Sequence, residues 1–180
     1  MTILETQGLA ARQAARVLAV AGSARKDAAL EAIAAALERR SGEILAANQR
    51  DLEAARAAGM RPALLDRLAL DEGRVAGIVD GVRQVKALPD PIGQTVKMGV
   101  RPNGLTIGKR RVPLGVIGII YEARPNVTVD AAALCLKSGN AVILRGGKEA
   151  FYSSSAMVAV MRDALEEAGL PRDCVALVND

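Results

Sequence analysis

Val112-Pro-Leu-Gly-Val-Ile-Gly-Ile-Ile120 is the stretch that decides the fold. It is an apolar run without polar alternation, a pattern typical of a parallel strand covered on both faces by helices. Its glycines and its proline disfavour a buried helix, because each of them weakens helix formation. The run therefore predicts a buried strand.

The residues after this strand predict a helix. Pro125 disfavours helical backbone at Arg124. Asn126 or Thr128 can cap the helix that follows by accepting a hydrogen bond from a free backbone N–H. The alanine-rich run beyond them ends at Ser138-Gly139, because glycine tolerates the left-handed backbone of a helix C-terminus.

Two more strands and a second helix complete this unit. Residues 141–144 and 174–178 are short β-prone runs, and residues 153–168 show a helical pattern ended by Gly169 and Pro171. The order is βαβαβ, which is half of a nucleotide-binding sheet with ligands at the carboxyl ends of the strands. A three-stranded half-sheet leaves an open edge, so we expect the chain to be part of a longer protein.

Helices and a β-hairpin precede the sheet. Apolar periodicity and end signals place helices at residues 8–20, 28–39 with Asp27 as cap, 41–58, 63–68 with Pro62 at the first position, and 71–85. Arms at 95–100 and 105–110 flank Arg101-Pro-Asn-Gly104, in which Asn-Gly is a strong hairpin signal. The sequence thus predicts an α/β fold in three units: a helical lead over 1–93, a β-hairpin over 94–111 and a parallel, Rossmann-like βαβαβ half-sheet over 112–180.

Composition excludes several kinds of protein. The net charge is +4, but basic and acidic residues are interleaved and only three aromatics are present, so no nucleic-acid surface is expected. Residues 94–121 hold five cations and no acid; this basic edge suits a phosphate-bearing ligand or an acidic neighbouring subunit, with solubility as the alternative. The absence of histidine excludes Ser-His-Asp devices and histidine metal sites from this chain.

The cysteines and the N-terminus indicate a cytoplasmic protein. Cys135 and Cys174 form neither a disulfide framework nor a metal-binding spacing, which fits a reducing compartment. The first residues lack a basic segment followed by an apolar core, so they do not form a signal peptide. No run of about eighteen apolar residues exists to span a membrane.

Three motifs resemble a known family. They are Pro113-Leu-Gly-Val-Ile-Gly118, Tyr121-Glu-Ala-Arg-Pro-Asn126 and Leu136-Lys-Ser-Gly-Asn-Ala-Val-Ile-Leu-Arg-Gly-Gly-Lys-Glu149. They are similar to the gamma-glutamyl phosphate reductases, the proline-biosynthetic branch of the aldehyde dehydrogenase superfamily. Asn48-Gln-Arg-Asp51 and residues 93–111 resemble the same family more weakly.

This resemblance implies an activity and an architecture. The complete enzyme would use NADPH to reduce L-glutamate 5-phosphate to L-glutamate 5-semialdehyde with release of phosphate. The N-terminal helices would pack on an aldehyde dehydrogenase-like nucleotide-binding domain, and the 94–111 hairpin would support a homo-oligomer. The family uses a cysteine thiolate as nucleophile, which we expect outside this chain together with the catalytic domain. The 180 residues alone are therefore expected to be inactive.

Neither cysteine present suits that role. Cys135 lies between Leu134 and Leu136 in the predicted helix, where an apolar setting raises the pKa of a thiol. Cys174 begins a strand and is also expected to be structural. No residue is assigned to a metal.

Asn126, Arg124 and Glu122 are the candidates for substrate chemistry. By resemblance, the Asn126 amide is a candidate oxyanion donor, and a plain helix cap is the alternative. Arg124 can contact a phosphate or carboxylate of the substrate from the loop it shares with Glu122. A surface ion pair between Glu122 and Arg124 is the competing interpretation.

The cofactor site is expected at the ends of the first two strands. Ile120 ends the first strand, and Arg145, Gly146, Gly147 and Lys148 follow the second, where dinucleotide folds meet the adenosine ribose. Cations at that place accept a 2′-phosphate, which favours NADPH over NADH. A tight glycine turn with solvated charges is the alternative.

Two other functions remain open at this point. One is a general NAD(P)-dependent aldehyde dehydrogenase, of which this chain would again be a part. The other is a non-catalytic nucleotide-binding or assembly module made of the helices and the 94–111 hairpin.

Overall fold

The computed structural model describes residues 1–122 and 124–178. Ala123 of the Tyr121–Asn126 motif and the last two residues of the predicted 112–180 unit lie outside the described residues. The elements are α1 (Ile3–Ala19), α2 (Ser23–Arg39), α3 (Ser41–Ala57), α4 (Pro62–Leu68), α5 (Glu72–Ala87), β1 (Thr95–Val100), β2 (Thr106–Arg110), β3 (Val116–Ile120), α6 (Pro125–Lys137), β4 (Ala141–Arg145), the 3₁₀ turn η1 (Lys148–Ala150), α7 (Phe151–Glu167), η2 (Arg172–Cys174) and β5 (Val175–Leu177).

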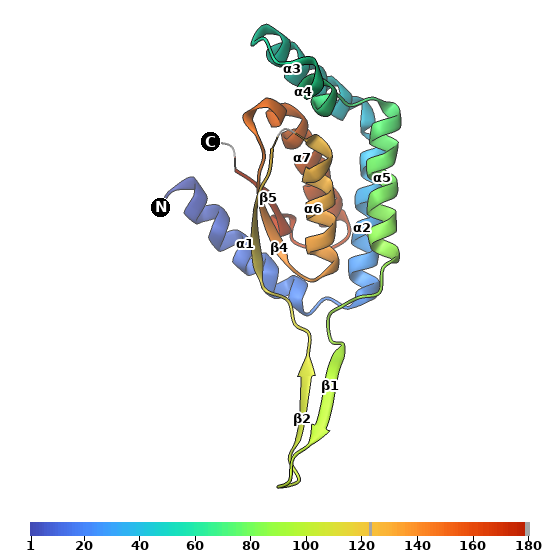
Figure 1. The fold of residues 1–180 in the computed structure, drawn as a ribbon, viewed down its shortest axis with the longest axis vertical. Coiled ribbons are helices and arrows are strands. Elements are labelled where there is room, and N and C mark those ends of the chain that lie inside the picture. Colours follow the sequence, from blue (N-terminus) through green and yellow to red (C-terminus); the bar gives the residue numbers. More distant parts are fainter. Residues whose placement is uncertain (123, 179–180) are drawn as a thin grey trace.

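The three parallel strands form one sheet in the order β3-β4-β5. Helix α1 covers one face, α6 and α7 cover the other, and α2 and α5 form a further layer outside α6 and α7 (Figure 1). The core is aliphatic, as the shortage of aromatic residues requires. Its fully buried large side chains include Leu30, Leu37, Met157 and Met161. The predicted α/β fold with N-terminal helices, a hairpin and a parallel βαβαβ half-sheet is confirmed.

The prediction that the first strand is covered on both faces is wrong. Strand β3 begins only at Val116, and Ile117 and Ile119 pack against the core. Val116 and Gly118 on the opposite face are exposed, and Ile120 is 80% exposed. The cause is position: in the sheet formed by the described residues, β3 is an edge strand, whereas α1 lies mainly against the central strand β4.

Several helix starts also differ from the predictions. Helix α1 begins at Ile3 because Thr2 and Glu5 form a capping box. Helix α2 begins at Ser23, so Asp27 is not a cap but lies inside the helix, where it pairs with Lys137 at 2.6 Å. In contrast, Pro62 at the start of α4 is confirmed. The helix predicted over 71–85 is α5, and Asp71 is its cap: the Asp71 side chain accepts the Arg74 N–H.

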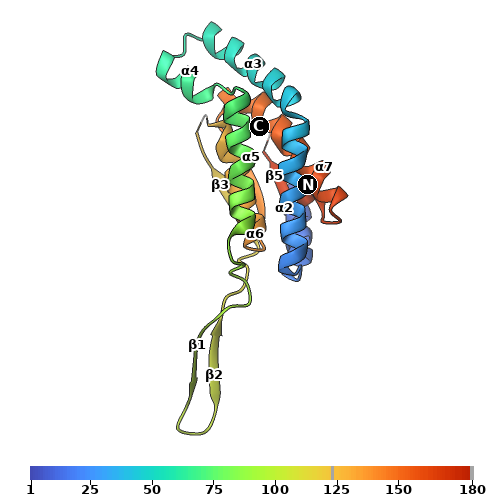
Figure 2. The ribbon, with the colours of Figure 1, turned by 90° about the vertical axis from the view of Figure 1, so that its right-hand side faces the viewer.

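The β1–β2 hairpin projects away from the rest of the chain (Figures 1 and 2). Its strands are antiparallel, and the turn closes with a hydrogen bond from the Gly104 N–H to the Arg101 carbonyl at 2.9 Å. Every residue of both strands is exposed. Within the described chain, the hairpin therefore has no third strand and no helix to cover it.

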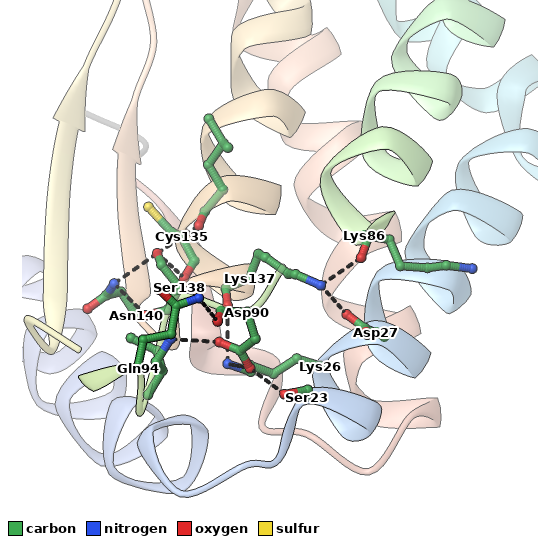
Figure 3. A network of polar contacts seen from close by, with 12 residues as sticks. Ser23, Lys26, Asp27, Lys86, Asp90, Gln94, Cys135, Lys137, Ser138 and Asn140 are labelled. Carbon is green, nitrogen blue, oxygen red and sulfur yellow. Dashed lines mark hydrogen bonds and ion pairs between the residues drawn. The ribbon is translucent and has the colours of Figure 1, made fainter. Parts of the chain in front are cut away.

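A polar network around the buried Lys26 side chain fixes the base of this hairpin (Figure 3). The Asp90 carboxylate forms an ion pair with Lys26 Nζ at 2.6 Å and accepts a hydrogen bond from the Ser23 hydroxyl at 2.7 Å. The Asp90 backbone carbonyl accepts a hydrogen bond from Gln94 Nε2 at 2.8 Å. The network joins the start of α2 to the segment that leads into β1.

No helix among the described residues is long and apolar enough to cross a membrane.

Candidate functional site

The residues predicted to follow the second strand line one cavity. Arg145, Gly146, Gly147 and Lys148 border a cavity of about 570 Å³ at the carboxyl ends of β4 and β5. Arg145 and Lys148 are exposed, so both cations are available to an anionic ligand. The rest of the wall is formed by Glu149, Phe151, Tyr152, Ser154, Leu177 and Val178.

Tyr121 explains why glycine follows Arg145. A Cβ at Gly146 would lie 3.2 Å from three atoms of the Tyr121 ring, which is closer than side-chain carbons normally approach. The Tyr121 N–H donates to the Arg145 carbonyl at 3.0 Å. The Tyr121 hydroxyl lies 2.7 Å from the Thr128 hydroxyl, which lies 3.1 Å from that of Ser154. Buried polar contacts thus hold together the ends of β3 and β4 and the first turns of α6 and α7.

Asp51, which was not among the predicted site residues, fixes the α7 wall of this cavity. Its carboxylate oxygens accept the backbone N–H groups of Tyr152 at 3.0 Å and Ser153 at 2.8 Å, and the Ser153 hydroxyl also donates to it. No side chain within α7 caps that helix. Asp51 on α3 therefore supplies the cap from elsewhere in the chain, which also explains why α7 begins at Phe151 rather than at Ser153.

Asn48 extends the same contact. Its amide donates to the Leu68 carbonyl at 2.8 Å and to Ser153 Oγ at 3.0 Å, and its oxygen accepts the Leu70 N–H at 2.8 Å. The sequence pattern of α3 does not single out Asn48 and Asp51, because Gln49 and Arg50 between them are polar as well.

Arg124 and Asn126 lie in a second cavity, of about 370 Å³, beside α4, α5 and α6. Asn126 is the second residue of α6, and Nδ2 donates to Asp130 Oδ2 at 3.1 Å. The expectation that Asn126 or Thr128 caps this helix is therefore wrong. Pro125 occupies the first position and lacks an N–H, and Thr128 is buried against Tyr121. Burial raises the pKa of Asp130, although the Asn126 hydrogen bond opposes this shift.

Two of the predicted site residues line neither of these cavities. Ile120 and Glu122 are both exposed and border neither the Arg145 cavity nor the Arg124 cavity. Glu122 and Arg124 form no ion pair among the described residues; their contact is a backbone hydrogen bond of 2.8 Å from the Arg124 N–H. The structure thus separates the predicted residues into an Arg145–Lys148 group and an Arg124–Asn126 group.

Neither thiol is placed for nucleophilic chemistry. Both cysteines are buried. Burial raises the pKa of Cys135 to about 11, and burial together with the Asp173 carboxylate raises the pKa of Cys174 to about 12. In the described part of the chain, no group of three or more His, Cys, Asp or Glu residues is placed to hold a metal ion.

Comparison with known proteins connects this arrangement to one family. The chain is 57% identical over 176 residues to the gamma-glutamyl phosphate reductase of Moorella thermoacetica, covering 98% of this chain and 42% of that protein. It is 57% identical over 180 residues to the enzyme of the same name from Xanthomonas axonopodis pv. citri, covering 100% of this chain and 43% of that protein. The chain therefore spans less than half the length of these relatives. A scan against family models gave no match.

Solved structures agree with the sequence relatives. The gamma-glutamyl phosphate reductase of Thermotoga maritima superposes with a TM-score of 0.95 at 42% identity, covering 98% of this chain and 43% of that one. The enzyme from Saccharomyces cerevisiae gives a TM-score of 0.92 at 32% identity, covering 99% of this chain and 46% of that one. A probable aldehyde dehydrogenase from Listeria monocytogenes, at 17% identity and a TM-score of 0.70 over 96% of this chain and 35% of that one, shares the fold. The chain belongs to the gamma-glutamyl phosphate reductase family.

Proposed function

We propose that the protein containing this chain reduces L-glutamate 5-phosphate to L-glutamate 5-semialdehyde with NADPH and releases phosphate. The observation that carries this proposal is the 57% identity to relatives named gamma-glutamyl phosphate reductase. The cavity bordered by Arg145 and Lys148 supports it. The similarity to other aldehyde dehydrogenases, at 16–20% identity for three of them, bears on the fold alone.

The Arg145–Lys148 cavity fits a nicotinamide cofactor with a phosphorylated ribose. Arg145 is the last residue of β4, and Lys148 begins the turn that precedes α7. Two exposed cations beyond a parallel strand are suited to a 2′-phosphate, which favours NADPH over NADH. When bound, NADPH supplies the hydride. The residues of this chain would hold and orient it, with Ile120 at the open end of β3 as a further contact.

The Arg124–Asn126 cavity is the proposed place of the acyl phosphate. Asn126 Nδ2 gives one hydrogen to Asp130, and its second N–H can stabilise negative charge on the acyl oxygen. Arg124 would contact the phosphate or carboxylate of the substrate, with Glu122 in the same loop. The reactive thiolate would come from another part of the protein, because both thiols here are buried and protonated near neutral pH.

We also propose that the three predicted units have separate tasks: a helical lead over 1–93, an oligomerisation hairpin over 94–111 and a cofactor-binding half-sheet over 112–180. The exposed apolar side chains of the hairpin support the second assignment. The cation-rich residues 94–121 suit an acidic surface of a neighbouring subunit.

The test is an assay of the full-length protein. Oxidation of L-glutamate 5-semialdehyde should require both NADP and inorganic phosphate, because the acyl phosphate is the product in that direction. Activity without phosphate would indicate a general aldehyde dehydrogenase instead. Failure of the intact protein to bind NADPH would favour a non-catalytic assembly module. Arg124→Ala should raise the KM for phosphate or for the aldehyde, and unchanged kinetics would remove Arg124 from the proposal.

A further inference from the structure

The cavity beside α5 and α6 contains a carboxylate without a cationic partner. Asp130 lies on the second turn of α6 and lines this cavity. Its side chain accepts a hydrogen bond from the neutral Asn126 amide, and among the described residues no Lys or Arg lies within ion-pair distance of it. A partly buried carboxylate is costly to ionise without a counter-charge. Its setting therefore favours a cationic ligand group.

Small residues on α5 make room for this group. Gly77 lines the same cavity, and a Cβ built there would meet no atom within 4 Å. A Cβ at Gly81 would lie 3.6 Å from Asp130 Oδ1, so α5 passes close to the carboxylate without a side chain between them. The open volume next to Asp130 is thus a consequence of the α5 sequence.

The rim of the cavity is mainly cationic. Arg67, Arg74 and Arg124 line it, together with the Asp66 carboxylate. Arg74 is held by Asp66 Oδ1 and by the Ala69 carbonyl, each at 2.8 Å. In the described part of the chain, neither Arg67 nor Arg124 forms an ion pair. One unpaired carboxylate and two unpaired guanidinium groups around one cavity complement a zwitterion that carries an ammonium and a carboxylate on the same carbon atom.

We propose that this cavity binds the amino-acid end of the substrate, with Asp130 accepting the α-ammonium group and the guanidinium groups of the rim receiving the α-carboxylate. This inference rests on the proposed function and names the residues that would select an α-amino acid. Asn126 links the two ends of the substrate, because its amide nitrogen faces Asp130 and keeps one N–H for the acyl oxygen.

The experiment compares two aldehydes in the full-length enzyme, with NADP and phosphate. L-Glutamate 5-semialdehyde has the α-ammonium group, and 5-oxopentanoate has a hydrogen in its place. Asp130→Asn should lower kcat/KM for the amino-acid aldehyde by about 10- to 100-fold, because a charge-assisted hydrogen bond is lost. The same change should alter kcat/KM for 5-oxopentanoate and the KM for NADP by less than about 3-fold, since neither contact involves an ammonium group.

Two further variants make the result decisive. Asp80→Asn is the matched control, because Asp80 is an exposed carboxylate on α5 that lines a different cavity; it should leave both aldehydes unchanged. Asp130→Glu keeps the charge and should retain part of the preference for the amino-acid aldehyde. Equal losses for both aldehydes in Asp130→Asn, or no loss for either, would overturn the assignment. A wild-type enzyme that oxidises neither aldehyde would refute the proposed function, and this inference with it.

Discussion

Lys26 Nζ lies 2.6 Å from Asp90 Oδ2, and the lysine is 2% exposed. The same ammonium group donates to the Lys137 carbonyl at 3.2 Å. Burial opposes ionisation of Asp90, but hydrogen bonds from Lys26, the Ile92 N–H and Ser23 outweigh it and lower the pKa of the carboxyl. Through this ion pair and this hydrogen bond, the Lys26 ammonium group joins α2 to the residues that lead into the hairpin and to the end of α6.

Removal of one member of this pair should destabilise the protein strongly. Asp90→Asn leaves the Lys26 charge buried without a counter-ion, for which we expect a loss of about 3–5 kcal/mol in the free energy of unfolding. The double variant Lys26→Met/Asp90→Leu should lose much less, because no charge remains buried. The measurement is urea denaturation. Lys86→Met is the control, since Lys86 and Glu31 form a half-exposed pair, whose loss should cost no more than about 1 kcal/mol. Equal midpoints for Asp90→Asn and Lys86→Met would contradict this account.

Asp51 should support both stability and cofactor binding. Asp51→Ala leaves the N–H groups of Tyr152 and Ser153 without their acceptor, at a cost of about 1–3 kcal/mol. Tyr152 borders the Arg145 cavity, so the Kd for NADPH should rise when the start of α7 loosens. Thermal unfolding and an NADPH titration measure the two effects. Glu53→Gln, an exposed change on the same helix, should alter neither. A Kd that is unchanged in Asp51→Ala would separate the α7 cap from the cofactor site.

The two thiols should be inert in the folded protein. The pKa values of Cys135 and Cys174 are raised to about 11 and about 12, so at pH 8 almost none of either thiol is ionised and burial blocks access. We expect iodoacetamide to modify neither cysteine in native full-length protein at pH 8, and both in urea. Peptide mass mapping separates them from other cysteines. Cys135→Ala should keep the kcat near that of the wild type. Loss of activity without loss of stability would indicate that Cys135 acts as a nucleophile.

Local residue chemistry accounts for the parts of the fold that the sequence predicts well. Pro62 and Asp71 set helix starts by themselves, and Gly139, with φ of 74°, ends α6 where a left-handed residue is needed. Distant contacts account for the parts it misses. The cap of α7 comes from α3, 102 positions earlier, and no local pattern reports it. Strand β3 is apolar but half-open, because its burial depends on which strand lies beside it.

The same distinction applies to the candidate site. Arg145 to Lys148 could be grouped from sequence because consecutive residues after a strand share one sheet edge. Asp130 could not, because its proposed role depends on α5 passing beside α6, with Gly81 close to the Asp130 carboxylate and Gly77 lining the same cavity. That placement follows from tertiary packing and not from any periodicity within α6.

Arg145 should determine the choice of cofactor. Arg145→Gln removes a cation that faces the proposed 2′-phosphate position, so the KM for NADPH should rise about 10-fold or more, corresponding to about 1.4 kcal/mol. The KM for NADH should change by less than about 3-fold, because NADH lacks that phosphate. Steady-state kinetics with both cofactors measure the ratio. Arg39→Gln, an exposed change at the end of α2, is the control. A parallel rise for both cofactors would indicate a structural role for Arg145.

The hairpin should carry subunit association through one of its faces. Met98 pairs with Gly108 and Val100 with Thr106, so these two apolar side chains lie on the same face; they are 65% and 72% exposed. Met98→Lys/Val100→Lys places two charges there and should shift the full-length protein towards smaller species, because burying an unpaired charge in an interface is costly. Sedimentation at several concentrations measures the mass. Lys97→Gln, on the opposite face, should have a much smaller effect. If deletion of residues 94–110 leaves the number of subunits per assembly unchanged, association does not use the hairpin.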